Sequence, residues 1–467
     1  MTPLINRRRF FHLSGAIAAT TSLRAAMTGS ATSPENVARP SLDAIVARIR
    51  PPVFAPRDIA VTDFGARPNG GVDARPAVQL AIRHCNATGG GRVVVPRGVW
   101  DLVGPLHLLS RVHLHLEDGA HLRFVTDDPS RYLPVVLSRW EGTEFFNYSP
   151  FIYAYQAHNV AITGAGTIDG NAHDTFVKWR PRQAEDQLAL RKMGAESVPV
   201  AERVFGAGHW LRPPLVQFFG CTNVLMDGPR LIDSPFWVIH AVACTNVTLR
   251  RVQVDSPHLN SDGFDPESCT DVLVEDCVFR TGDDCIAIKS GRDQDAWRIG
   301  RPTENVVIRR CELNAPSAGS GLALGSEMSG GIANVFVEDL RMGYVKSAIN
   351  FKSNLDRGGL VEGVSLQNIT VEKADILLQV TTGYHGYRGG NFPPTFRGFT
   401  FEDIRCQSAD VPISVVGVPA AKVQDFTMRN LTVERAEKSA VVRNVRNLRA
   451  DNVVVGGQPL AFAADID

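Results

Sequence analysis

Three aspartates in two short acidic runs are the residues best suited to chemistry in this sequence. Asp262 stands in NSDGFDP (260–266), and Asp283 and Asp284 stand together in TGDDCIAIKSG (281–291). Three carboxylates within a few ångströms of one another cannot all stay ionised, so at least one pKa should rise. A carboxylic acid beside a carboxylate is what glycosidic cleavage needs, because one protonates the leaving oxygen while the other activates water.

A lone Asp-Asp pair is more often a turn of a repeat protein or part of a calcium site. Here the two acidic runs lie about one sequence repeat apart, which favours the catalytic interpretation. Adjacent strand residues normally point to opposite faces, so Asp283 and Asp284 can share a cleft only if the strand bends. Gly282 could permit that bend.

The elements that position these residues come from a repeat. Asn, Asp or Gly followed by an alternating apolar/polar run starts at Asn159, Asn223, Asn246, Asp271, Asn305, Asn334, Gly363, Gly398, Asp425 and Asn447. A unit of about 22 to 35 residues with two or three short strands cannot bury its own apolar face, so it must stack on copies of itself. The repeat therefore predicts an all-β fold, a single-domain parallel β-helix with neighbouring coils about 4.8 Å apart.

The repeat also predicts which residues align. His240, Asp262, Asp283, Asp284, Ser320, Asn350 and Lys352 all fall in the later strand of their coils and should form one polar stripe. Cysteines fall at two fixed offsets from the repeat start: Cys221, Cys244, Cys269, Cys277 and Cys311. We interpret them as stacked columns of buried small side chains, with disulfides as the alternative.

Other segments lack the repeat. Residues 74–85 have a helical pattern and could cap the open N-terminal end of the stack. Residues 171–210 are polar and helix-leaning, which indicates an inserted loop. RRRFF (7–11) before a short apolar stretch resembles a twin-arginine export signal. We expect a signal peptide over 1–30, a linker over 31–55 and the catalytic β-helix over 56–467.

Composition limits the functional classes. The chain has 467 residues with 49 basic and 49 acidic side chains, and 44% of its residues are hydrophobic. This balance indicates a globular protein with a core and argues against nucleic acid as a partner. After the signal, no apolar run reaches the about 18 residues that a membrane helix needs, so no membrane insertion is expected. The sequence leaves the oligomeric state open.

The two acidic runs, with GSEMSGG (325–331) and SPFWVIH (234–240), resemble glycoside hydrolase family 28, the polygalacturonase family, over about residues 60–461. The resemblance implies a right-handed, pectin-lyase-like β-helix and hydrolysis with inversion, without cofactor or metal. By the same resemblance, Asp283 is the general acid, and Asp262 and Asp284 hold and activate the water.

Two positions depart from the family pattern. Ser320 replaces the histidine of the family's Gly-His-Gly, and Asn350 replaces the arginine of its Arg-Ile-Lys, so that Lys352 alone remains. Asn cannot supply the bidentate, charge-assisted contact that Arg makes with a uronate carboxylate. A hydrolase acting on rhamnogalacturonan or another uronan is therefore an alternative to a polygalacturonase.

The predicted substrate contacts share a place on or beside the stripe: Asn260, Asp265, His240, His258, Lys289, Arg292, Ser320, Asn350, Lys352 and Tyr384. RWEGTEFFNYSP (139–150) is similar to exo-acting bacterial members, whose loops block one end of the groove. We thus expect an exported bacterial hydrolase, periplasmic or secreted, that removes units from the ends of pectic chains in plant cell walls. A β-helical lyase and a non-catalytic glycan-binding β-helix are the other candidates.

Overall fold

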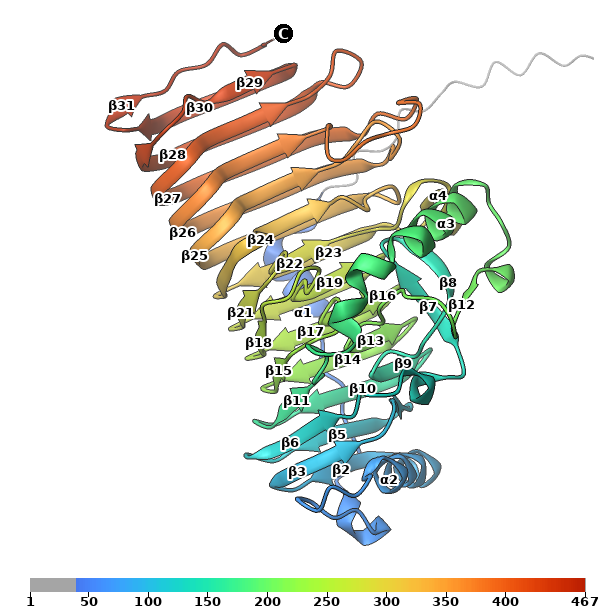
Figure 1. The fold of residues 1–467 in the computed structure, drawn as a ribbon. Helices are drawn as coiled ribbons and strands as arrows, with labels where there is room; N and C mark the ends of the chain where they lie inside the picture. The colour runs from blue at the N-terminus through green and yellow to red at the C-terminus, as the bar shows by residue number, and fades with distance from the viewer. Residues whose placement is uncertain (1–38, 467) are drawn as a thin grey trace, which may run out of the picture. The chain divides into compact units, whose positions relative to one another are not determined.

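The computed structural model describes residues 39–466, which form one compact unit of parallel coils. The coils follow one another in chain order from β2 to β30 (Figure 1). Parallel pairing over the whole stack, from β1–β2 to β28–β30, matches the predicted right-handed parallel β-helix. The expected signal segment and the first part of the expected linker lie outside the described residues.

Three ladders of strands make up the coils. The first contains β1 (Asp58–Ala60), β2 (Gly91–Val95), β5 (Val112–Leu116), β10 (His158–Thr163), β14 (Thr222–Asp227), β17 (Thr245–Arg250), β20 (Thr270–Glu275) and β23 (Thr303–Arg309). The second contains β3 (Gly98–Leu102), β6 (Ala120–Phe124), β11 (Thr167–Asp169), β15 (Arg230–Ile232), β18 (Gln253–Ser256) and β21 (Val278–Thr281). The third contains β4 (Leu106–Leu108), β9 (Ile152–Tyr155), β13 (Val216–Phe219), β16 (Ile239–Val242), β19 (Phe264–Glu267) and β22 (Ile286–Ile288).

Towards the C-terminus the strands of a coil join into long, bent strands. These are β24 (Glu312–Gly325), β25 (Ile332–Lys352), β26 (Leu360–Thr381), β27 (Thr395–Val416), β28 (Val423–Ala436) and β30 (Val445–Val455). The short β29 (Val441–Arg443) pairs with β27, and β31 (Gln458–Pro459) turns back antiparallel on β30.

Each repeat start occupies the same strained corner of its coil. All ten starts have positive φ, between 51° at Asn159 and 73° at Gly398. Glycine adopts this left-handed conformation freely and asparagine and aspartate tolerate it, which explains the residue types found there. The side chains then link coil to coil, since Asn246 Nδ2 donates to Asn223 Oδ1 at 2.7 Å and Asn223 Nδ2 to Asn159 Oδ1 at 2.9 Å.

The interior of the coils is a continuous apolar column. Alternate residues of the first ladder point inward and are buried, as Val247, Leu249, Val272 and Val274 show. All eight cysteines are buried and free, as the predicted columns of small side chains require. The Cys269 Sγ even accepts the Cys244 N–H at 3.4 Å.

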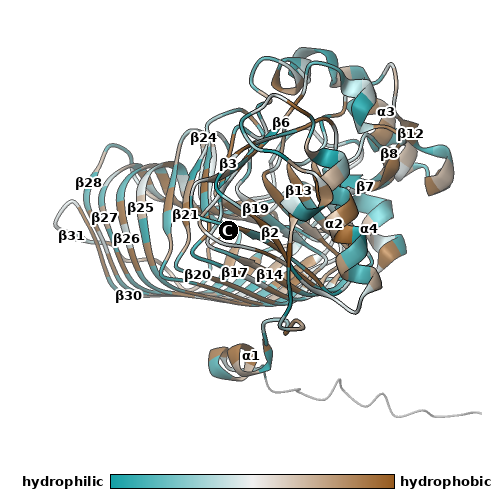
Figure 2. Cartoon of the chain, turned by 90° about the horizontal axis from the view of Figure 1, so that it is seen from below, coloured by the Kyte–Doolittle hydropathy of each residue, from teal (hydrophilic) through white to brown (hydrophobic). Residues whose placement is uncertain are grey.

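Two helices from the N-terminal part of the chain flank the stack, one at its N-terminal end and one near its middle. The predicted cap is α2 (Arg75–Ala87), which buries Val78, Ile82 and Cys85 beside β2 (Figure 1). Within the expected linker, α1 (Leu42–Arg48) packs outside the sheet against β20 and β23 (Figure 2). Its Ile45 joins a small apolar cluster with Leu273 and Val307.

The predicted insertion is helical and lies beside a hairpin. It contains the 3-10 helices Phe176–Arg182 and Val200–Glu202, the helix α3 (Ala184–Ala195) and β12 (Val204–Phe205). The strand β12 pairs with β8 (Thr143–Asn147), which forms an antiparallel hairpin with β7 (Val136–Trp140). The helix α3 contacts α4 (Asp293–Ile299). Two more 3-10 helices are Val61–Phe64 and Pro129–Tyr132.

Of the helices in residues 39–466, none has the length and apolar character needed to cross a membrane.

Candidate active site

The three predicted aspartates lie together. One carboxylate oxygen from each of Asp262, Asp283 and Asp284 lies within 4.8 Å of the others. The parallel register explains this, because Phe264 of β19 pairs with Ile286 of β22. Asp262 and Asp284 each stand two residues before that pair, so they occupy equivalent places in neighbouring coils.

Two glycines allow the backbones around Asp283 to approach closely. A Cβ on Gly282 would lie 2.1 Å from the carbonyl oxygen of His258, and one on Gly319 would lie 1.9 Å from the Asp283 backbone. The φ angle of Gly282 is not in the left-handed region. Glycine is therefore needed here for lack of space, rather than for the unusual backbone conformation that the sequence suggested.

Two buried lysines lie against the aspartates. Lys352 Nζ lies 2.5 Å from Asp284 Oδ2. Lys289 Nζ lies 3.6 Å from Asp262 Oδ2, 3.5 Å from Asp265 Oδ1 and 4.5 Å from the centre of the Trp237 ring. Such a cluster is stable in a buried place only because opposite charges balance.

The surroundings separate the protonation states of the three acids. Burial and the charge of Asp284 raise the pKa of Asp283. Burial, with Asp265 and Asp283 beside it, raises the pKa of Asp262 well above its ordinary value. Burial also acts on Asp284, but Lys352, Lys289 and the Ser320 N–H outweigh it and lower the pKa of Asp284. One carboxylate thus lies beside two groups that favour the neutral acid, the combination that acid–base catalysis uses.

Half of the predicted substrate contacts line the pocket around the aspartates. These are Asn260, Lys289, Arg292, Lys352 and Tyr384. Asn260 also holds the acid, because its backbone N–H donates to Asp283 Oδ2 at 3.3 Å while its side-chain oxygen accepts from Arg212 at 2.8 Å.

The other predicted contacts lie behind or beside the pocket. His240 and Asp265 are completely buried, and the His240 ring contacts Gln217 and Glu267. Ser320 and Asn350 support Asp284 from behind. The Ser320 N–H donates to Asp284 Oδ1 at 2.7 Å, and Asn350 Nδ2 donates to Ser320 Oγ at 3.1 Å.

His258 is also absent from the pocket lining, because its Nε2 contacts Asp233 Oδ1 at 2.6 Å.

Sequence reasoning missed four charged or titratable residues of the pocket: Glu141, Arg191, Glu327 and His385. Glu141 sits at the turn of the β7–β8 hairpin and contacts Arg191 of α3. Glu327 accepts from Arg292 at 2.7 Å and lies 3.3 Å from Lys289 Nζ. Glu327 falls inside the family-like run 325–331 and His385 follows Tyr384, whereas no pattern marks Arg191.

Three clustered carboxylates could in principle hold a hard cation such as Ca²⁺. The two ammonium groups already supply positive charge at this cluster, Lys352 on Asp284 and Lys289 on Asp262. The residues present therefore suit acid–base chemistry better than the calcium-assisted elimination of a lyase.

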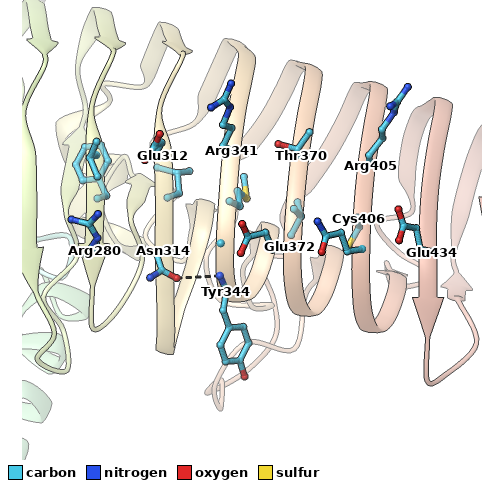
Figure 3. Close-up of a pocket in the computed structure, with 17 residues that line it drawn as sticks. Arg280, Glu312, Asn314, Arg341, Tyr344, Thr370, Glu372, Arg405, Cys406 and Glu434 are labelled. Carbon is cyan, nitrogen blue, oxygen red and sulfur yellow. Dashed lines mark hydrogen bonds between the residues drawn. The ribbon is translucent and has the colours of Figure 1, made fainter.

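A larger groove of about 640 Å³ lies on another flank of the coils. Figure 3 shows Arg280, Arg341 and Arg405 there with Glu312 and Glu434, and a hydrogen bond from the Tyr344 N–H to Asn314. Its acids and bases alternate from coil to coil and do not form a carboxylate cluster. The smaller, aspartate-lined pocket is therefore the better candidate for the chemistry.

A parallel β-helix with paired carboxylates in a small charged pocket defines the class of the protein as a polysaccharide-active enzyme. The family model "Glycosyl hydrolases family 28" matches residues 138–452. The chain belongs to this family and is a glycosidase.

Relatives with solved structures or curated names support the family assignment. An exopolygalacturonase structure from Thermotoga maritima is 36% identical, with a TM-score of 0.86 over 90% of this chain and 96% of that one. The endo-polygalacturonase of Pectobacterium carotovorum is 27% identical over 80% of this chain and 87% of its own. The exo-poly-alpha-D-galacturonosidase of Dickeya chrysanthemi is 24% identical over 87% of this chain and 73% of its own.

Proposed function

We propose that this glycosidase hydrolyses pectic polysaccharide and releases galacturonate-type units from a chain end. The observation that carries the proposal is the pairing of Asp283, whose pKa is raised, with Asp284, which Lys352 keeps ionised. The identity of 36% to an exopolygalacturonase supports the substrate class.

The reaction follows from these protonation states. Asp283 gives its proton to the glycosidic oxygen as the bond from that oxygen to the anomeric carbon breaks. A water attacks the anomeric carbon and loses a proton to Asp284. Asp262 holds that water, since its own pKa is raised and it can act as a hydrogen-bond donor. Both products carry neutral hydroxyl groups where the bond was broken. Asp284 then releases its proton to solvent and Asp283 takes one up, which restores the starting state.

The walls of the pocket support exo action. Arg191 from α3 and Glu141 from the β7–β8 hairpin contact one another at the pocket, and Arg292 Nη2 lies 3.4 Å from Glu141 Oε2. The pocket encloses only about 80 Å³. These ion pairs join two segments that stand outside the coils at the wall of the pocket, and a small pocket walled in this way favours binding of a chain end over the middle of a chain.

Recognition of a uronate needs a cation that faces the sugar. Lys352 and Arg292 line the pocket, and the Tyr384 ring lies 5.0 Å from Lys352 Nζ. An aromatic face beside a cation suits a sugar acid, because the ring packs against the C–H groups while the ammonium meets the carboxylate. Asn350, buried against Ser320, contributes no charge to this contact.

We assign inversion of configuration on the family resemblance. Retaining and inverting enzymes differ in the separation of their two carboxyl groups, about 5–5.5 Å against about 6.5–9.5 Å. The nearest oxygens of the three aspartates lie within 4.8 Å of one another, and this short spacing does not itself favour inversion, so the assignment rests on the resemblance. Proton NMR of the first product formed decides between inversion and retention.

We further propose that the chain is exported for work on plant cell walls. The basic and apolar pattern of residues 1–30 supports a twin-arginine signal, with a linker over 31–55 and the catalytic β-helix over 56–467. N-terminal sequencing of the protein secreted by a bacterial host checks the cleavage, and a Lys-Lys replacement of Arg7 and Arg8 should abolish export.

The test of the function is hydrolysis by the purified protein of homogalacturonan and, separately, rhamnogalacturonan. We expect galacturonate from homogalacturonan, and a 10²–10⁴-fold lower rate for Asp283→Asn. The matched control is Asp255→Asn, an exposed aspartate one coil away, which should keep full rate. Unsaturated products would identify a lyase, release from rhamnogalacturonan alone would identify the alternative substrate, and binding without turnover would identify a glycan-binding protein.

A further inference from the structure

A second cluster of ligand-type side chains lies on three successive coils. His173 follows β11, Asp233 directly follows β15 and His258 follows β18. These strands are consecutive members of one ladder, since β11 pairs with β15 and β15 with β18. The ladder therefore places the three turns side by side, and one ligand atom from each residue lies within 4.8 Å of the other two.

The cluster is assembled around Asp233. Its Oδ1 lies 2.6 Å from His258 Nε2, and its Oδ2 accepts the backbone N–H of His173 at 3.2 Å. The two imidazole rings lie 5.1 Å apart. Within residues 39–466, the ion-pair partner of Asp233 is a histidine rather than a lysine or arginine. The aspartate side chain is 25% exposed and His173 is exposed, so an ion could enter from solvent.

We propose that His173, Asp233 and His258 bind a divalent transition-metal ion of the zinc type. Two imidazoles and one carboxylate are the ligand set that Zn²⁺ takes in open sites, with water in the fourth position. The ion would replace the proton shared by His258 Nε2 and Asp233 Oδ1, so binding releases protons and weakens at low pH. The backbone N–H of His173 orients the carboxylate as an outer-shell partner.

Such an ion would tie the insertion to the catalytic loop. His173 stands at the start of the insertion that carries Arg191, and His258 stands two residues before Asn260, which contacts Asp283. Binding of an ion to residues from both segments stabilises the folded state by mass action. The site is separate from the reacting groups, and its role is to fix the wall of the pocket.

The experiment uses the full chain, freed of any affinity tag and stripped of metal with a chelator. Zn²⁺ is titrated by calorimetry, Co²⁺ by its visible absorption, and the Tm is followed in both. We expect one ion per chain, a rise in Tm with Zn²⁺ and a Co²⁺ spectrum of low coordination number. The variant His173→Ala should bind Zn²⁺ at least about 10–100-fold more weakly and lose the rise in Tm.

The matched control is His121→Ala. His121 and Asp169 also form a His–Asp pair, at 2.9 Å, but within residues 39–466 no third metal-ligand side chain joins them. It should leave the Zn²⁺ affinity unchanged. A second variant, Asp233→Asn, keeps the shape but removes the charge and should also lose binding. Equal Zn²⁺ affinity in the wild type, His173→Ala and Asp233→Asn, or no binding by the wild type, would overturn the proposal and leave a hydrogen-bonded cluster.

Discussion

The ammonium of Lys352 lies 2.5 Å from the carboxylate of Asp284, inside a pocket where Asp284 is almost completely buried. This contact decides how the aspartates share protons. It lowers the pKa of Asp284, while burial and the charge of Asp284 raise the pKa of Asp283. A lysine at the end of β25 thus acts on the pKa of both aspartates in the turn before β22.

Replacement of Lys352 by Met should shift the pH dependence of hydrolysis. Lys352 lowers the pKa of Asp284, so its loss raises that pKa, and the base is then protonated until a higher pH. The acidic limb of the rate profile should move to higher pH and kcat should fall. Steady-state rates measured across the pH range of activity check this.

The basic limb should behave differently. It reports loss of the proton from Asp283, whose pKa is raised, so the wild-type rate should fall as the pH rises through that pKa. Lys352→Arg keeps the charge and should leave the acidic limb near its wild-type position. An acidic limb that does not move in Lys352→Met would contradict the role given to this contact.

Replacement of Arg191 by Ala should loosen the end of the pocket. The contact between Arg191 and Glu141 joins α3 to the β7–β8 hairpin, so its loss should admit longer chains and raise the share of oligomeric products. Chromatography of early products from homogalacturonan, with viscosity as a second readout, measures the change. The control is Lys192→Ala, which changes an exposed residue of the same helix. An unchanged product profile in Arg191→Ala would show that the contact between Arg191 and Glu141 does not limit the enzyme to chain ends.

Replacement of Asn246 by Ala should destabilise the stack by about 2 kcal/mol. Asn246 has a φ of 59° and donates to Asn223 Oδ1 and to the carbonyl of Arg50, both at 2.7 Å. Alanine loses these hydrogen bonds and adds about 1–2 kcal/mol of left-handed strain. Asn246→Gly loses the hydrogen bonds without the strain. Its free energy of unfolding, measured in urea, should therefore lie between that of the wild type and that of Asn246→Ala. Equal values for both variants would show that backbone strain does not matter here.

Replacement of Asp265 by Asn should flatten the dependence of stability on pH. Burial raises the pKa of Asp265 well above its ordinary value of about 3.9, so the folded state keeps a proton that the unfolded state loses. That stabilisation is complete below about pH 4 and is lost as the pH rises towards the folded pKa. The wild type should therefore lose stability over this range, while Asp265→Asn, which cannot ionise, loses less.

Urea unfolding of Asp265→Asn and of wild type at several pH values measures this difference. Asp255→Asn, an exposed change, should follow the wild-type curve. A variant less stable than wild type at every pH would mean instead that an ionised Asp265 stabilises Lys289, which lies 3.5 Å away.

The sequence by itself determined the coils and the neighbouring positions of the three aspartates. The spacing of the repeat starts fixes the parallel register, because a left-handed Asn, Asp or Gly at each start gives every coil the same corner. Once the register is fixed, Asp262 and Asp284 must be neighbours, since each precedes a paired strand residue by two positions. The helix at 74–85 and the insertion after residue 170 could also be predicted from the sequence, because both segments lack the repeat.

Only the tertiary structure decided which contacts are made by side chains that lie outside the repeat. The path of the insertion brings Arg191 to Glu141 and His173 to Asp233, and no periodicity encodes the path of a loop. The burial of polar side chains could not be predicted from the sequence either, because a strand pattern gives the direction of a side chain but not what covers it. His240 lies on the expected stripe and Asp265 beside it, yet both are sealed from solvent. Trp237 and Lys289 line the pocket and contact them: the ring centres of Trp237 and His240 lie 4.9 Å apart, and Lys289 Nζ lies 3.5 Å from Asp265 Oδ1.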